Sequence, residues 1–161
     1  MSSMSLRNLR NNGLILVVLR KETIDTDENK NYNLSSEKSI ASGLSRQEAL
    51  NSLIVDAIQD IKGKNILKLD LTHLDDAPTD FFIIAEGESI TQVRAIADNV
   101  QKRIKEEVRS IPLSLEGLSD SNWILIDYFD TVVHVFYPET RRYYDLEDLW
   151  SDARIIEYQN L

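Results

Sequence analysis

The chain has 161 residues, and its 42% hydrophobic and 28% charged content is typical of one ordinary globular domain with a tail. Because cysteine is absent, disulfides, thiolate nucleophiles and thiolate-held zinc are excluded. The longest apolar run, residues 14–19, is far shorter than the ~20 residues that cross a bilayer, so we expect no membrane contact.

The acidic balance of residues 46–161 restricts the kind of partner. This part carries 12 Lys and Arg against 22 Asp and Glu. Such a surface repels phosphate backbones, whereas nucleic-acid binders usually present a clustered basic face. We therefore expect a basic protein partner and no direct nucleic-acid binding as the main mode.

Residues 1–44 are predicted to be an extension and a polar linker, poorly ordered and outside the domain formed by residues 45–161. Residues 1–21 contain basic and no acidic side chains, typical of a bacterial extension or of a transit peptide. Residues 23–43 are rich in Asp, Glu, Asn, Ser and Lys and have no helical or strand period. The expected location is the cytoplasm, with a chloroplast or mitochondrion as the alternative.

The domain is predicted to begin with a helix and two strands. Ser45 and Glu48 form a capping box, and apolar residues then repeat at helical spacing as far as residue 62. Residues 67–71 alternate leucine with polar side chains, which indicates a strand with one solvated face. Residues 80–85 are apolar on both faces, as expected for a central strand.

The second half is predicted to hold a long helix, three strands and a short helix. Ser89 and Gln92 form another capping box, and the helix they start reaches residue 109. The three strand candidates are residues 113–116, 123–128 and 131–137, and the second and third of them should form a hairpin. The terminal helix is predicted over residues 139–151. This order, with one β-α-β crossover, predicts an α/β sandwich with helices packed on a mixed β-sheet.

Few residue patterns indicate chemistry. His73 and His134 lie far apart in the sequence, and neither has an i, i+4 partner for a helical metal site. Asp127 and Asp130 flank the hairpin turn, but their spacing does not make two carboxylates converge. Gly87 precedes a helix without any glycine-rich phosphate motif. We expect no metal and no cofactor, and a nucleotide-binding enzyme is kept as an alternative.

The strand at residues 123–128 has no plainly polar face. Trp123, Leu125 and Asp127 share one side, and Ile126 and Tyr128 lie on the other. One layer of helices can cover one side. The other side either packs against further helices of the protein or contacts a partner, and its aromatic and aliphatic composition suits a partner contact.

These residues carry a resemblance to the ribosomal silencing factors of the Iojap family. The resemblance extends from about residue 45 to residue 150 and is most specific in residues 116–117, 123–128, 132–136 and 142–150. It implies a nucleotidyltransferase-like sandwich without catalysis, a homodimer in solution, and binding to the large-subunit ribosomal protein numbered fourteen. The resemblance further implies that the protein, bound there on the large ribosomal subunit, blocks joining of the small subunit and represses translation.

The family pattern also implies which residues contact the partner. We expect the contact to comprise Trp123, Leu125, Ile126, Asp127 and Tyr128, supported by Asp130, His134 and Arg142. One departure concerns the hairpin turn, where this chain has Phe129 in place of the usual glycine. A large-subunit assembly factor that uses the same surface is a further alternative.

Overall fold

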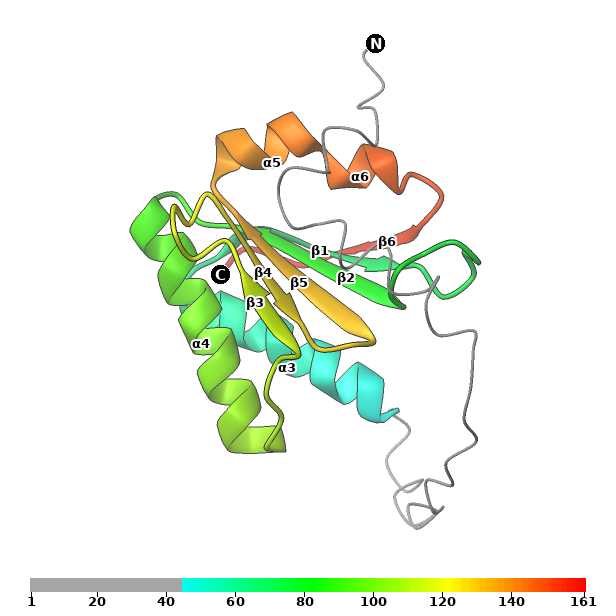
Figure 1. Cartoon of the computed structure of the whole chain (residues 1–161), viewed down its shortest axis with the longest axis horizontal. Coiled ribbons are helices and arrows are strands. Elements are labelled where there is room, and N and C mark those ends of the chain that lie inside the picture. Colours follow the sequence, from blue (N-terminus) through cyan, green and yellow to red (C-terminus); the bar gives the residue numbers. More distant parts are fainter. Residues whose placement is uncertain (1–44) are drawn as a thin grey trace.

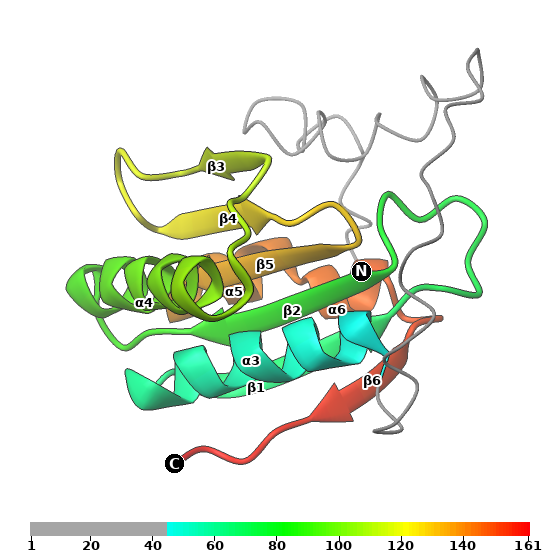
Figure 2. The same ribbon diagram turned by 90° about the horizontal axis from the view of Figure 1, so that it is seen from below.

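The structure, a computed structural model, describes residues 45–161 as a six-stranded mixed sheet with helices on both faces (Figure 1). Helices α3 and α4 cover one face, and α5 and α6 cover the other (Figures 1 and 2). The predicted mixed α/β sandwich is confirmed. The expectations for residues 1–44, including the apolar run, the linker and the transit peptide, lie outside the described residues.

Helix α3 (Arg46–Asp60) begins at the predicted capping box. The Glu48 N–H donates to Ser45 Oγ over 3.1 Å, and the Ser45 N–H donates to Glu48 Oε2 over 3.0 Å. Two amides that the first helical turn leaves without partners are thereby satisfied. The apolar stripe of the helix, which includes Ile54, Ala57 and Ile58, is fully buried against the sheet.

Strands β1 (Lys64–Asp70) and β2 (Phe81–Glu86) pair antiparallel, and α4 (Ile90–Val108) follows β2. Ser89 Oγ accepts the Gln92 N–H, as the cap predicts. The Gln92 carboxamide differs from a regular capping box, because it accepts the Glu88 N–H and donates to the carbonyl of Ile61. The start of α4 is thus tied to the end of α3.

The remaining predicted strands are β3 (Ser114–Glu116), β4 (Trp123–Asp127) and β5 (Thr131–Phe136), and the β4–β5 hairpin is confirmed. The strand order is β3-β4-β5-β2-β1-β6, with β5 parallel to β2. Helix α4 therefore crosses from β2 to a parallel strand at the far edge, and the hairpin fills the space between them. Strands covered on both faces are apolar throughout, which explains their continuous hydrophobic runs.

The carboxyl-terminal prediction of one helix is wrong. Helix α5 (Pro138–Tyr144) stops at Asp145, whose φ of 43° is left-handed, and α6 (Leu146–Leu149) is a separate short helix. Edge strand β6 (Arg154–Glu157) then pairs with β1, and the sequence did not predict it. All four of its residues are exposed, so no alternation of polar and apolar side chains indicates a strand.

The first capping box gives a direct test of the fold. We expect Ser45→Ala to lower the free energy of unfolding by about 1 kcal/mol, because the Glu48 N–H loses its acceptor. Urea unfolding followed by circular dichroism measures the loss. The matched control is Ser52→Ala on the exposed side of α3, which should be neutral or slightly stabilising. Equal effects of the two substitutions would show that the cap contributes nothing.

Candidate functional site

A groove of about 590 Å³ lies between the β3–β4 loop and α5. The first residues of β4 also line it. Its lining consists of Glu116, Gly117, Ser119, Asp120, Asn122, Trp123, Leu125, Glu139, Thr140, Tyr143 and Tyr144. We call it the β4–α5 groove.

The lining combines negative charge with aromatic rings. Three carboxylates come from both sides of the groove, on Glu116, Asp120 and Glu139. The rings of Trp123 and Tyr144 lie 4.7 Å apart between centroids, and Tyr143 is 65% exposed. Aromatic faces and carboxylates together bind a side chain with an aliphatic stem and a positive end. The groove is therefore suited to a basic protein segment.

The β3–β4 loop is fixed by a glycine and an arginine. Gly117 has φ of +82°, and a Cβ atom there would lie 1.8 Å from the carbonyl oxygen of Trp123, so no other residue fits. The Arg94 guanidinium of α4 donates to Ser121 Oγ over 3.2 Å and to the carbonyl of Leu118. One wall of the groove is thus held by the loop backbone and by the opposite helix layer.

The orientation of Trp123 is set by His134. The indole N–H donates to His134 Nδ1 over 3.1 Å, so the neutral imidazole carries its proton on Nε2. His134 is fully buried, and burial lowers its pKa to about 3. Its Nε2 has no hydrogen-bond partner within residues 45–161. The histidine is a fixed acceptor beneath the groove, and its environment excludes the charged form.

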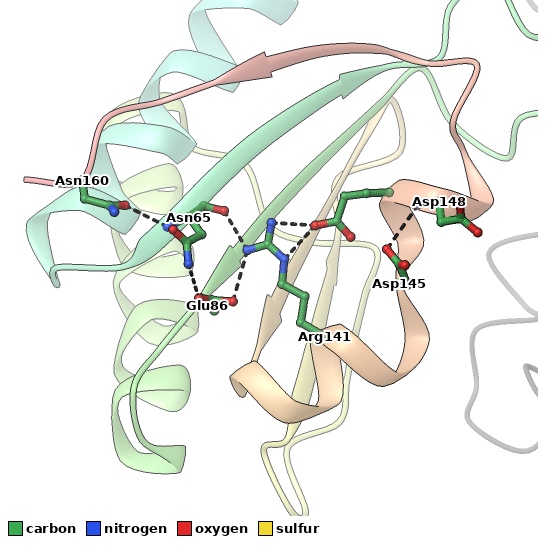
Figure 3. Close-up of polar contacts among 7 residues, drawn as sticks. Asn65, Glu86, Arg141, Asp145, Asp148 and Asn160 are labelled. Carbon is green, nitrogen blue, oxygen red and sulfur yellow. Dashed lines mark hydrogen bonds and ion pairs between the residues drawn. The ribbon is translucent and has the colours of Figure 1, made fainter. Parts of the chain in front are cut away.

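The position of α5 depends on Arg141, which sequence reasoning missed (Figure 3). Its guanidinium pairs with Glu147 over 2.6 Å and with Glu86 of β2 over 3.4 Å, and it donates to the carbonyl of Asn65 over 2.7 Å. The side chain is almost completely buried. Sequence reasoning named the next residue, Arg142, which is exposed. No local pattern distinguishes the two arginines, because Glu86 and Asn65 are distant in sequence.

Of the two alternatives for the Trp123 face, packing against further helices of the protein is the one that the structure shows. Helices α5 and α6 cover this face, and Trp123 is 9% exposed. Only Trp123 and Leu125 of the expected contact set line the groove. On the opposite face, Ile126 is completely buried and Tyr128 nearly so, and burial raises the pKa of Tyr128 to about 12. Ile126 therefore cannot contact a partner in the folded protein.

The other expected residues do not gather at the groove. Asp127 is buried and its carboxylate accepts the Phe129 N–H over 2.8 Å, which is a turn-forming contact. Asp130 lies in the same turn, at the opposite end of β4 from the groove, and is half-buried. Burial and the charge of Asp80 raise the pKa of Asp130. Arg142 is on α5 outside the groove lining.

Within residues 45–161, no group of three or more His, Asp or Glu side chains is placed to hold a metal ion. No helix in the same range has the length and apolar character to cross a membrane.

The fold and the groove define a class of small α/β protein that presents an acidic, aromatic groove at one end of a sheet covered on both faces. The family model described as "Ribosomal silencing factor during starvation" matches residues 44–161, and the chain belongs to this family. Members of the family are regulatory proteins that act on the ribosome, which places this chain in translation regulation.

The curated relatives cover most of the chain. A protein of Halalkalibacterium halodurans named "Ribosomal silencing factor RsfS" is 40% identical over 118 residues, which are 73% of this chain and 98% of the relative. A protein of the same name from Chromobacterium violaceum is 42% identical over 110 residues, 66% of this chain and 86% of the relative. A mouse relative, "Mitochondrial assembly of ribosomal large subunit protein 1", is 36% identical over 45% of this chain and 33% of its own length.

Two solved structures share the fold. A crystal structure from Chromobacterium violaceum has a TM-score of 0.62 and 39% identity, and the match covers 67% of this chain and 88% of that one. A crystal structure from Bacillus halodurans has a TM-score of 0.58 and 37% identity, with 68% and 98% coverage.

Arg141 and Arg142 form a matched pair for a stability test. Arg141→Ala should lower the free energy of unfolding by about 3 kcal/mol, because it removes a nearly buried cation and leaves the partly buried carboxylates of Glu86 and Glu147 without their partner. Arg142→Ala, one residue further on, should change it by less than about 0.5 kcal/mol. Chemical denaturation measures both. Similar losses in the two variants would contradict the assigned role of Arg141.

His134 makes stability depend on pH. Its folded-state pKa of about 3 is below the ordinary 6.5, so below pH 6.5 the unfolded chain binds a proton that the folded protein does not. Stability present above pH 6.5 is therefore lost as the pH falls towards 3, by roughly 1.4 kcal/mol per unit. Urea unfolding at pH 7 and pH 5 should show this slope, and His134→Gln should flatten it. An unchanged slope in His134→Gln would refute this assignment.

Proposed function

We propose that the protein represses translation by binding the large ribosomal subunit and blocking the joining of the small subunit. The proposed partner is the large-subunit ribosomal protein numbered fourteen, which the family resemblance implies. The observation that carries the proposal is the β4–α5 groove, with its carboxylates and aromatic rings. Ribosomal proteins are in general basic, so their segments complement this lining in both charge and apolar character.

The groove limits which side chains act as the contact. Trp123 and Leu125 form part of its floor and are reached by a partner only through its opening. The exposed residues Glu139 and Tyr143 of α5 form its accessible rim. A partner segment therefore binds first to the rim and inserts one or a few side chains towards Trp123. Fixed walls reduce the ordering cost of such binding.

We further propose that the protein acts by binding and has no catalytic activity, and that residues 45–161 are sufficient for it. The cytoplasm is the proposed location, with an organelle as the alternative because organellar relatives exist. A homodimer of the free protein is also proposed. Strand β6 supports it, because this edge strand exposes Ile155 and Ile156 and leaves its outer side open for pairing within residues 45–161.

A second candidate function is assembly of the large subunit, which the printed name of the mouse relative favours. The same groove would then bind an immature subunit. Ribosome profiles of a deletion strain distinguish the two functions. Accumulated large-subunit precursors support assembly, whereas mature subunits that join more readily during starvation support repression.

A subunit-joining assay tests the repressor directly. Saturating protein should keep purified large and small subunits apart in a sucrose gradient, and Glu139→Lys should weaken binding to the large subunit by at least about 10-fold, because it reverses a charge on the groove rim. The control is Asp56→Lys, an equal charge change on the exposed face of α3. Unchanged subunit joining in the presence of saturating wild-type protein would disprove the proposed function. Equal losses of affinity in the two variants would show that the groove is not the binding site.

A further inference from the structure

The β4–β5 turn has a strained backbone and exposes an aromatic ring. Phe129 has φ of 76°, and the Asp130 N–H donates to the Tyr128 carbonyl over 3.1 Å, which closes a tight turn of three residues. This region of backbone space favours glycine, and a residue with a side chain is strained in it. Phe129 is 55% exposed, so its burial does little to offset the strain.

The strain persists because the turn is held from several sides. The Phe129 N–H donates to Asp127 Oδ1 and its carbonyl accepts the Thr79 hydroxyl, each over 2.8 Å. The Phe81 N–H donates to the Asp130 carbonyl over 3.0 Å. None of these contacts needs a phenylalanine at position 129, because none of them involves its side chain. The ring is therefore presented to the solvent on a rigid support.

Other apolar side chains are exposed at this end of the sheet. Leu113 is 58% exposed, and its N–H donates to the Asp127 carbonyl over 2.7 Å, which places it beside the strand end that leads into the turn. Ile111, two residues earlier, is 71% exposed. We call Ile111, Leu113 and Phe129 the hairpin patch. Large apolar side chains exposed near one another at one end of a sheet are candidates for an interaction site.

Two carboxylates adjoin the patch. Asp130 follows Phe129, and Asp80 stands next to Thr79, whose hydroxyl binds the Phe129 carbonyl. The charge of Asp80 contributes to the raised pKa of Asp130, so the two carboxylates repel each other. The loop that contains Asp80 and the β4–β5 turn lie at the same end of the sheet in both views (Figures 1 and 2). A cation between them would relieve the repulsion.

We propose that the hairpin patch, together with Asp80 and Asp130, binds a lysine or arginine side chain from a basic protein segment of the large ribosomal subunit. This contact is additional to the β4–α5 groove and rests on the proposed function. The Phe129 ring packs against the aliphatic stem or faces the cation, and the carboxylates bind the charged end.

Charge also distinguishes this partner from two others. An RNA backbone would place phosphates against Asp80 and Asp130 and be repelled. A second copy of the chain, bound about a two-fold axis through the turn, would place the same two carboxylates opposite each other. A basic protein segment is the partner that reduces the repulsion.

The substitution Phe129→Gly distinguishes a role of the phenylalanine side chain in binding from a role in the stability of the turn. The melting temperature should stay the same or rise, because glycine relieves the backbone strain, while affinity for purified large subunits at low salt should fall at least 5-fold. The matched control is Lys62→Gly, which relieves a positive φ of 59° at the end of α3 and should leave affinity unchanged. Asp130→Asn should also weaken binding and should lessen its dependence on salt.

Three other outcomes would contradict the inference or the proposed function. If wild-type protein binds large subunits and Phe129→Gly binds equally tightly, the hairpin patch is no contact, and the proposed function is unaffected. If wild-type protein does not bind large subunits at all, the proposed function fails and this inference fails with it. If Phe129→Gly changes self-association of the free protein in sedimentation, and not subunit affinity, the patch binds a second copy and the inference is wrong.

Discussion

Coverage of both faces of the sheet is the constraint on which the rest of the structure depends. Strands β2, β4 and β5 have no polar face, so the sheet requires two helix layers, and α5 with α6 provides the second one. Once that layer is in place, Trp123 lies beneath it and the strands present little surface to a partner. The surface available to a partner is therefore at the ends of the strands, on the loops that follow them and on the exposed sides of the helices.

The β4–α5 groove lies at one end of the sheet, and polar side chains from distant elements fix its walls. Arg141 fixes α5 to β1 and β2, and Arg94 fixes the β3–β4 loop to α4. His134 fixes the ring at the floor through its Nδ1 acceptor. Because each wall has its own anchor, the groove is preformed. A preformed site binds with a smaller loss of conformational entropy than one that must be ordered by its partner.

Local signals predicted much of the fold and little of the site. The Ser45 cap, the apolar stripe of α4 and the hairpin were predictable, because each depends on residues within one or two turns of chain. Strand β6 and the break at Asp145 depend on distant partners or on one backbone angle, and neither leaves a periodic pattern. For the same reason, the sequence indicated the exposed Arg142 and not the buried Arg141.

The two ends of β4 show why a strand rich in aromatic and aliphatic residues need not be exposed along its length. Composition identifies residues that avoid water, and these satisfy that tendency equally well under helices of their own chain as under a partner. The groove at the start of β4 and the turn at its end present aromatic rings beside carboxylates, on Tyr143 and on Phe129. The central residues of the strand are buried and hold these two exposed regions at a fixed separation.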